Sequence, residues 1–345
     1  MSMTATLRQR LLGTDQDFQK FVLFLAVATA APMLIIPATR SFHPDSASVL
    51  SIVGLLSFLG GPAHVSTTTW FYADPVARGH FREHLVRYLW APLGLTIGAT
   101  AMYIIWHEQA PTRWLNLCFT AWLLWHYQRQ NYGIHSFVSR VTSGEPASRA
   151  EEYILRLAVV GGFIAGFKTV GFGGGTPLVD EQYARPLFYL GAAITMSLPL
   201  MIAWLWWRTP AMRAAPARLG TLLMGAGFFV PTFVFGDTTS TFLTYALAHG
   251  LQYIVFMSYV AARTGEQTEG RPGVLTLLAC IASVGVLLSV TGDYVLVRDI
   301  NLLPLYGFSI GLTMGHFVVD AGIWRLRDEF PRRYASAAFP FLRRR

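Results

Sequence analysis

The chain has 345 residues, of which 53% are hydrophobic and only 13% are charged, and its formal net charge is +8. A soluble domain of this size usually carries about 25% charged residues, so the composition excludes an ordinary soluble protein. It predicts an all-α polytopic integral membrane helix bundle, with residues 1–345 forming a single transmembrane domain. Contact with anionic lipid headgroups accounts for the positive charge, and no nucleic-acid partner is expected.

Ten apolar segments follow one another along the chain, each near the length of about 20 residues that crosses roughly 30 Å of hydrocarbon as a helix. The fifth contains Arg156 and Lys168, whose long side chains can reach opposite interfaces. We expect about ten transmembrane helices at approximately residues 21–37, 48–72, 88–106, 114–139, 153–171, 186–207, 219–235, 239–262, 273–291 and 302–324.

The distribution of basic residues predicts the orientation of these spans. Lys and Arg concentrate in the cytoplasmic loops of membrane proteins. The chain has 27 Lys and Arg residues in total. If the N-terminus is cytoplasmic, 21 of these 27 fall on the cytoplasmic side and Arg129 lies inside a span. The opposite side receives only Arg40, Arg113, Lys168, Arg185 and Arg298. We therefore expect both termini to be cytoplasmic (N-in/C-in), in a bacterial inner (plasma) membrane.

Residues 74–87 join the second and third spans and mix apolar and arginine side chains. This pattern predicts a helix lying in the cytoplasmic interface. His80 and His84 share one face of it at i,i+4 spacing, so they can chelate a metal or remain solvated. Whether His80, His84 and His135 contribute to a functional site stays open at this point.

Four histidines lie inside long apolar segments, in spans that all run from the outer face towards the cytoplasm. They are His64, His126, His249 and His316. At about 1.5 Å rise per residue, each lies roughly 15–22 Å from the outer face. Ionisable residues inside a bilayer are costly and indicate function, and imidazole is the commonest side-chain ligand of transition metals. The shared depth predicts a buried metal site, and interhelical hydrogen bonding is the alternative for each histidine.

Polar residues follow three of these histidines by one helical turn. They are Gln130, Gln252 and Asp320. The second ring nitrogen of a ligating histidine is usually held by a carboxylate, carbonyl or amide, so these side chains are expected in supporting roles. Asp320 is expected to bind the metal directly or to pair with the arginines that follow it.

Imidazole ligands without thiolates suit iron, zinc or copper, and manganese less well. Cys118 and Cys280 are too few to form a thiolate cluster. We expect one or two iron(II) ions, with zinc or copper open, in a dioxygen-dependent oxidoreductase acting on an apolar substrate such as a carotenoid or acyl chain. An electron donor is not specified by the sequence. The alternatives are a proton-coupled transporter that uses the intramembrane His and Asp residues, and a non-catalytic membrane assembly protein.

The segments around two histidines resemble the bacterial and archaeal Brp/Blh family of membrane β-carotene dioxygenases. Gly61-Pro62-Ala63-His64 is similar to the Gly-x-Pro-His element of that family, and the segment 247–254 is similar to its later histidine-containing helix. The resemblance implies an all-helical membrane fold with histidine-bound iron that cleaves a carotenoid, and it implies that His64, His126 and His249 are ligands.

The chain departs from the family pattern at three positions. The Gly and Asp that follow the first histidine in the family are replaced by Val65 and Thr68, and Tyr253 occupies the position of a second histidine on the later helix. We infer that His316 supplies the missing ligand. Tyr253 is therefore a further candidate, either to hold a ligand in place by a hydrogen bond or to bind the metal itself.

The topology is directly testable with reporter fusions. Fusions at Arg113 and Arg298 should behave as exported, and fusions at Arg149 and Arg271 should behave as cytoplasmic, because the basic residues segregate to one side. An exported fusion at Arg271 would overturn the ten-span count.

Overall fold

The computed structural model describes residues 3–40, 47–107, 109–169, 179–235, 237–267 and 271–343. This part of the chain is all-α and contains no strand. Each predicted span coincides with one helix or with a run of consecutive helices. In chain order these are α1 (Met3–Arg40); α2, α3 and α4 (Ala47–Gly60, Pro62–Thr67, Thr69–Ala73); η1 and α6 (Val86–Trp90, Ala91–Trp106); α7 (Ala110–Ser143); α8 (Arg149–Thr169); α9 (Glu181–Arg208); α11, η2 and α12 (Pro216–Ala226, Gly227–Phe229, Pro231–Val234); α13 (Thr238–Gln267); α14, η3 and α15 (Val274–Cys280, Ile281–Gly285, Val286–Gly292); and α17 (Leu303–Ile323).

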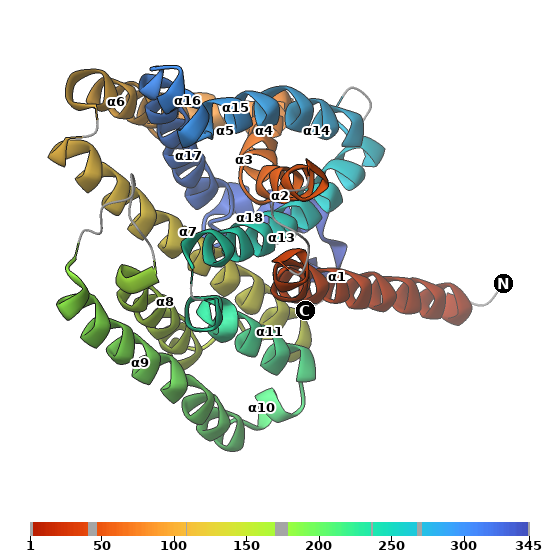
Figure 1. The fold of residues 1–345 in the computed structure, drawn as a ribbon. Helices are drawn as coiled ribbons and strands as arrows, with labels where there is room; N and C mark the ends of the chain where they lie inside the picture. The colour runs from red at the N-terminus through yellow and green to blue at the C-terminus, as the bar shows by residue number, and fades with distance from the viewer. Residues whose placement is uncertain are drawn as a thin grey trace.

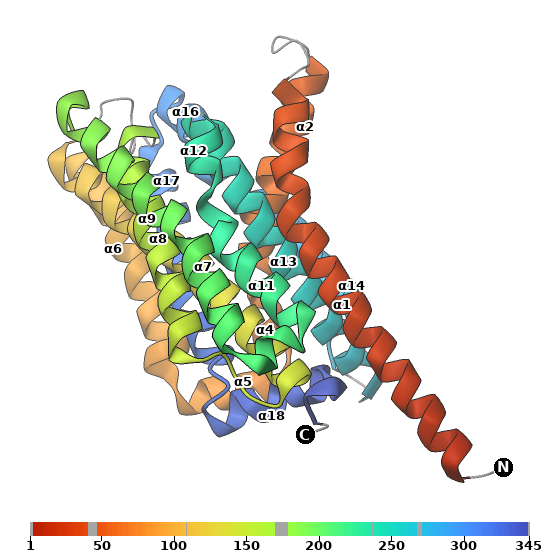
Figure 2. The ribbon, with the colours of Figure 1, turned by 90° about the horizontal axis from the view of Figure 1, so that it is seen from below.

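The long helices lie side by side, with α7 and α13 near the centre of the bundle (Figure 1). The helices α6 and α17 pack together on one side, α8 and α9 on another, and α1 runs along α13. The start of α1 and the C-terminal end of the chain lie at the same end of the bundle (Figure 2).

Four helices are long and apolar enough to cross a membrane, which identifies the chain as a membrane-type helical protein. They are Gln16–Ala38, Val86–Trp106, Glu181–Arg208 and Val274–Gly292. Only 17–33% of the most apolar stretch of each helix is buried inside the protein. Large apolar side chains on these helices, such as Ile97, Leu200 and Leu275, are 60–82% exposed. Contiguous exposed apolar surface of this kind suits contact with lipid.

Short helices close the end of the bundle at which the C-terminus lies. The predicted interfacial helix is α5 (Pro75–Glu83), and α18 (Glu329–Ala338) lies at the same end (Figure 2). α5 buries Ala77 and Phe81 and exposes Arg78 and Arg82, as its amphipathic sequence predicts. The short helices α10 (Pro210–Arg213) and α16 (Tyr294–Asp299) and the turn η4 (Pro340–Arg343) complete the described elements.

The fully buried carboxylate of Asp74 fastens these end elements to one another. It caps α5 by accepting from the backbone N–H of Val76 (3.3 Å), it accepts two hydrogen bonds from Arg271 (2.5 and 3.0 Å), and it accepts the Tyr334 hydroxyl of α18 (2.6 Å). Charge-assisted hydrogen bonds of this kind are the strong ones, so the contact orders three separate parts of the chain.

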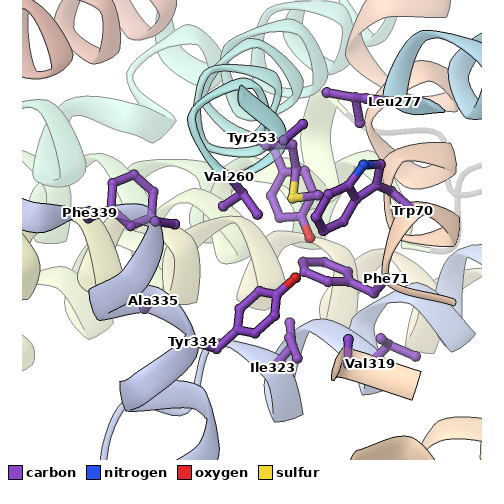
Figure 3. Packing of buried hydrophobic residues seen from close by; sticks show 14 of the residues in the cluster. Trp70, Phe71, Tyr253, Val260, Leu277, Val319, Ile323, Tyr334, Ala335 and Phe339 are labelled. Atoms are coloured by element: carbon purple, nitrogen blue, oxygen red, sulfur yellow. The ribbon is translucent and has the colours of Figure 1, made fainter. Parts of the chain in front are cut away.

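An aromatic cluster fills the interior at the same end. Trp70 and Phe71 from α4 pack with Tyr253 of α13 and with Tyr334 and Phe339 of the C-terminal segment (Figure 3). Trp70 and Phe71 are fully buried. Aromatic side chains bury large areas at low conformational cost, so this cluster seals the bundle between its centre and this end.

A second buried ionic cluster joins α7, α8 and α11. Arg218 donates two hydrogen bonds to the Glu151 carboxylate (2.7 and 2.8 Å), and Ser148 and Glu151 form a reciprocal capping box at the start of α8. His135 Nε2 lies 3.2 Å from the same carboxylate, in ionic contact but without hydrogen-bond alignment. Burial alone raises the pKa of Glu151, but its interactions with Arg218, His135 and Ser148 hold that pKa well below its usual range.

Glycines allow the backbone of α17 to pack directly against the backbone of α6. Gly307, Gly311 and Gly315 recur every four residues on one face of α17, and a methyl group added at Gly311 would lie 2.4 Å from Thr96 Cα and 2.8 Å from the Leu95 carbonyl oxygen of α6. Small residues at this spacing are typical of helix contacts in membranes, where close packing replaces the hydrophobic drive of water.

We expect Gly311→Ala to destabilise the protein by about 1–3 kcal/mol, because the atoms that it meets are backbone and cannot rotate away. Unfolding in detergent, followed by circular dichroism, measures the effect. Gly98→Ala on α6 is the matched control, since nothing lies within 4 Å of a methyl group there. Equal unfolding midpoints for the two variants would contradict the close contact.

Candidate metal centre

The four histidines that the sequence predicts to lie inside the membrane come together in the centre of the bundle. His64 lies on α3, His126 on α7, His249 on α13 and His316 on α17, and their candidate ligand atoms all lie within 4.8 Å of one another. All four side chains are buried, with exposed fractions of 8% or less. The predicted convergence is confirmed, and the group could hold a metal ion.

The four imidazoles are arranged in a closed ring, in which each lies next to two others. Ring centroids are 4.6 Å apart for His64 and His249, 4.9 Å for His249 and His126, 5.1 Å for His126 and His316, and 5.1 Å for His316 and His64. Neighbouring rings are inclined by 73–89°. Each imidazole therefore meets its neighbours edge to face, and no two of the four stack.

A break in the second apolar segment and a glycine contact position two of these rings. α2 ends at Gly60, Gly61 takes a non-helical conformation (φ −111°, ψ −83°), and Pro62 begins α3. A methyl group at Gly250 of α13 would lie 2.7 Å from the Gly60 carbonyl oxygen. Because the two backbones touch here, His64 and His249 project into the same space.

Hydrogen bonds fix the ring orientation of two histidines. His64 Nδ1 donates to the Gly60 carbonyl oxygen (2.8 Å), and because a carbonyl only accepts, Nε2 of His64 carries the lone pair. His316 Nδ1 lies 2.5 Å from the Thr68 hydroxyl oxygen, and a hydroxyl can either donate or accept in this pair. The His64 ring therefore presents an unprotonated Nε2, as a metal ligand requires, and the His316 ring does so when its Nδ1 donates to Thr68.

Five imidazole nitrogens in the cluster are buried without a hydrogen-bond partner among the described residues. They are Nε2 of His64, His126 and His316 and both ring nitrogens of His249. A buried polar atom left without a partner costs about 1–3 kcal/mol. A bound metal ion would supply the missing partner for four of these atoms at once, so the donor set fits a metal.

Asp320 lies on the ligand side of the histidines. Its Oδ2 atom is 3.8 Å from His316 Nε2 and 4.0 Å from His126 Nε2. Its Oδ1 atom accepts a short hydrogen bond from the Tyr253 hydroxyl, which in turn accepts from the Trp324 indole N–H (3.2 Å). Arg325 and Arg327 contact Asp328 instead. The described contacts thus place Asp320 beside the histidines and not in an ion pair with the arginines that follow it.

The spacing of these donors is compatible with one ion after a small contraction. Metal–nitrogen bonds of about 2.1 Å put neighbouring ligand atoms of an octahedral site roughly 3 Å apart and opposite ones roughly 4.2 Å apart. The measured separations, 3.8 and 4.0 Å from Asp320 and up to 4.8 Å among the histidines, are slightly larger.

The two glutamines brace the backbone around the histidines. Gln130 donates to the backbone carbonyl of His249 (3.1 Å) and to the Gln252 side chain (2.8 Å), and Gln252 donates to Thr29 (2.7 Å) and Asn131 (3.2 Å). These bonds tie α1, α7 and α13 together. Neither glutamine has a described hydrogen bond to an imidazole nitrogen.

Aromatic rings hold the remaining two imidazoles in place. His126 stacks on Phe317 at 4.3 Å and 25°, and the His249 ring lies 4.2 Å from that of Tyr127 at 34°. The partners that the sequence did not reveal are therefore Gly60, Thr68, Phe317 and Tyr127. Thr68 follows His64 by four residues, the same signal that drew attention to Gln130 and Asp320.

The other histidines whose role was open lie outside this cluster. His135 belongs to the Glu151 cluster, where its Nδ1 lies 3.0 Å from the Thr221 hydroxyl. His80 and His84 lie on and directly after α5, in a separate group.

No protein-family model, curated protein or solved structure matches this chain. The resemblance to membrane carotenoid dioxygenases therefore rests on the short motifs around His64 and His249 alone.

We expect Tyr253→Phe to weaken metal binding by roughly 10–100-fold, because Asp320 loses the hydroxyl that orients it. Metal affinity of the purified variant, measured by competition with a chelator, tests this. Tyr103→Phe is the matched control, since it removes a buried tyrosine hydrogen bond (2.9 Å, to Asn116) between α6 and α7. If both variants retain wild-type affinity, Tyr253 has no part in the site.

Proposed function

We propose that this protein is a membrane-embedded oxidoreductase with a histidine-ligated non-haem iron, acting on an apolar, lipid-like substrate. One observation carries the proposal: five buried imidazole nitrogens without hydrogen-bond partners converge beside a buried carboxylate. Such an arrangement in an apolar interior is costly unless a cation occupies it.

The donor set favours iron among the available metals. Imidazole and carboxylate donors without thiolate suit non-haem iron, and zinc and copper are bound by the same nitrogen donors. No glutamate lies beside the four histidines to act as the general base of a zinc hydrolase among the described contacts. When bound, iron would supply the activation of dioxygen.

The protein's own residues would orient the ligands and exclude water. Gly60 and Thr68 hold the Nδ1 atoms of His64 and His316, and Tyr253 holds Oδ1 of Asp320 so that Oδ2 faces the histidines. The aromatic cluster around Trp70 and Phe71 closes the bundle towards its C-terminal end. Water would thus reach the site poorly from that side.

A row of aromatic side chains beside His126 is the observation that favours an apolar substrate. Phe317, which stacks on His126, also contacts Phe119 (6.2 Å, 12°) and Trp122 (5.6 Å, 62°). Phe119 and Trp122 are only partly buried, so this row leads from the metal-binding group towards the outer surface of α7. A polyene or acyl chain could lie along these rings with its reactive carbons near His126.

The same observations support a membrane location. Lipid would cover the exposed apolar faces of α6, α9 and α14. Ten crossings with both termini cytoplasmic would account for the distribution of basic residues and for the position of both termini at one end of the bundle in Figure 2. A bacterial inner membrane fits this orientation. A dioxygenase inserts both oxygen atoms and needs no external reductant, so a requirement for an electron donor would instead indicate a hydroxylase or desaturase.

A proton-coupled transporter is the second candidate, favoured by the interrupted helices. The segments α2–α3–α4 and α11–η2–α12 are broken, and π-helical turns interrupt the third and ninth segments at Val86–Trp90 and Ile281–Gly285. Transporters place substrate sites at such breaks. A protein without a resident metal would move this candidate to first place.

Replacing His64, His126, His249 or His316 by Ala should abolish stoichiometric metal in protein purified without chelator, because each ring supplies one ligand. Inductively coupled plasma mass spectrometry of each variant measures the metal and identifies it. His107→Asn removes an exposed imidazole outside the cluster and should retain full metal content.

Some loss of stability should accompany metal loss, since the remaining nitrogens stay buried without partners. The proposal fails if the wild-type protein carries no stoichiometric transition metal and its unfolding midpoint does not respond to added iron, zinc or copper.

A further inference from the structure

A second group of metal-ligating side chains lies at the end of the bundle, apart from the central histidines. His80, Glu83 and His84 each offer a ligand atom, and these atoms lie within 4.8 Å of one another. His80 is half-buried and the other two are exposed. The group belongs to α5 and the residue after it, which lie beside α18 (Figure 2).

The end of α5 brings the two imidazoles together. The helix ends at Glu83, and His84 takes a non-helical conformation (φ −131°, ψ 45°). Its Nδ1 atom donates to the His80 backbone carbonyl (3.1 Å), which leaves the lone pair on Nε2. The two ring centroids are 4.4 Å apart. The backbone therefore fixes the His84 tautomer, as the Gly60 carbonyl does for His64.

Neighbouring elements hold the His80 ring in position. It stacks flat on Phe330 of α18 at 4.0 Å and 8°, and the Tyr88 hydroxyl lies 3.5 Å from its Nε2 atom. Asp328 adds a negative charge near this ring, and Arg87 adds a positive one. One imidazole is thus anchored by packing, while His84 and Glu83 are free to adjust around it.

We propose that His80, Glu83 and His84 form a second, solvent-accessible site for a borderline divalent metal ion such as Zn²⁺. The spacing His-x-x-Glu-His recurs in zinc proteins, where the two histidines bind the metal. Here α5 presents His80 and the residue after the helix presents His84, with Glu83 as a third donor. Zinc–nitrogen bonds of about 2.0–2.1 Å need ligand atoms roughly 3.3 Å apart, and rotation of the exposed Glu83 and His84 side chains supplies that contraction. With three protein ligands, the remaining position would be open to water, so the ion would exchange readily.

The experiment uses the full-length protein in detergent, titrated with Zn²⁺ against a chromophoric chelator. We expect wild-type protein to bind one exchangeable zinc ion in addition to any metal that it retains from purification. The double variant His80→Ala/His84→Ala should lose that exchangeable ion and keep the retained metal. Glu83→Gln should weaken zinc binding, whereas Glu329→Gln, an exposed carboxylate that pairs with Arg333, should not.

Separate outcomes distinguish this site from the central one. If wild-type protein binds no exchangeable zinc, or if the double variant binds zinc as the wild type does, the proposal is overturned. If the central histidines prove metal-free but the exchangeable ion is present and lost in the double variant, this site stands and the proposed oxidoreductase function fails. An unchanged unfolding midpoint of the double variant excludes misfolding as the cause of the loss.

Discussion

Five imidazole nitrogens that are buried without hydrogen-bond partners among the described residues impose the main constraint on this structure. At about 1–3 kcal/mol each, they would together offset much of the roughly 5–15 kcal/mol by which proteins are stable. The folded protein needs a compensating partner for these atoms. A cation in the middle of the four rings is the simplest one, because Nε2 of His64 carries a lone pair and the Asp320 carboxylate lies 3.8 Å from His316 Nε2.

The Glu151 cluster shows how the same chain buries charge when no ion is required. Arg218 and Ser148 donate to that carboxylate, Ser143 accepts a further hydrogen bond from Arg218 (2.7 Å), and His135 is held by Thr221. This cluster is nearly satisfied by protein groups, as buried ionic groups usually are. The central histidines differ because five of their buried nitrogens have no described partner, and only the Nδ1 atoms of His64 and His316 have one.

The sequence predicted the helices and the convergence of the histidines because both depend on periodicity and depth alone. It did not predict which atoms hold the rings, since that depends on how each helix is rotated against its neighbours. The Gly60 carbonyl accepts a hydrogen bond from His64 because α2 ends at Gly60. Gly250 has no side chain, so the backbone around Gly60 can pack directly against α13. The stripe Gly307, Gly311 and Gly315 was visible in the sequence, and it would have indicated the contact between α17 and α6.

Two residues outside α17 orient the groups that α17 contributes to the site. Thr68 contacts His316, and Tyr253 donates to Asp320. The polar side chains of His316 and Asp320 lower the hydropathy of α17, which explains why this helix is absent from the four that are apolar enough to cross a membrane by composition.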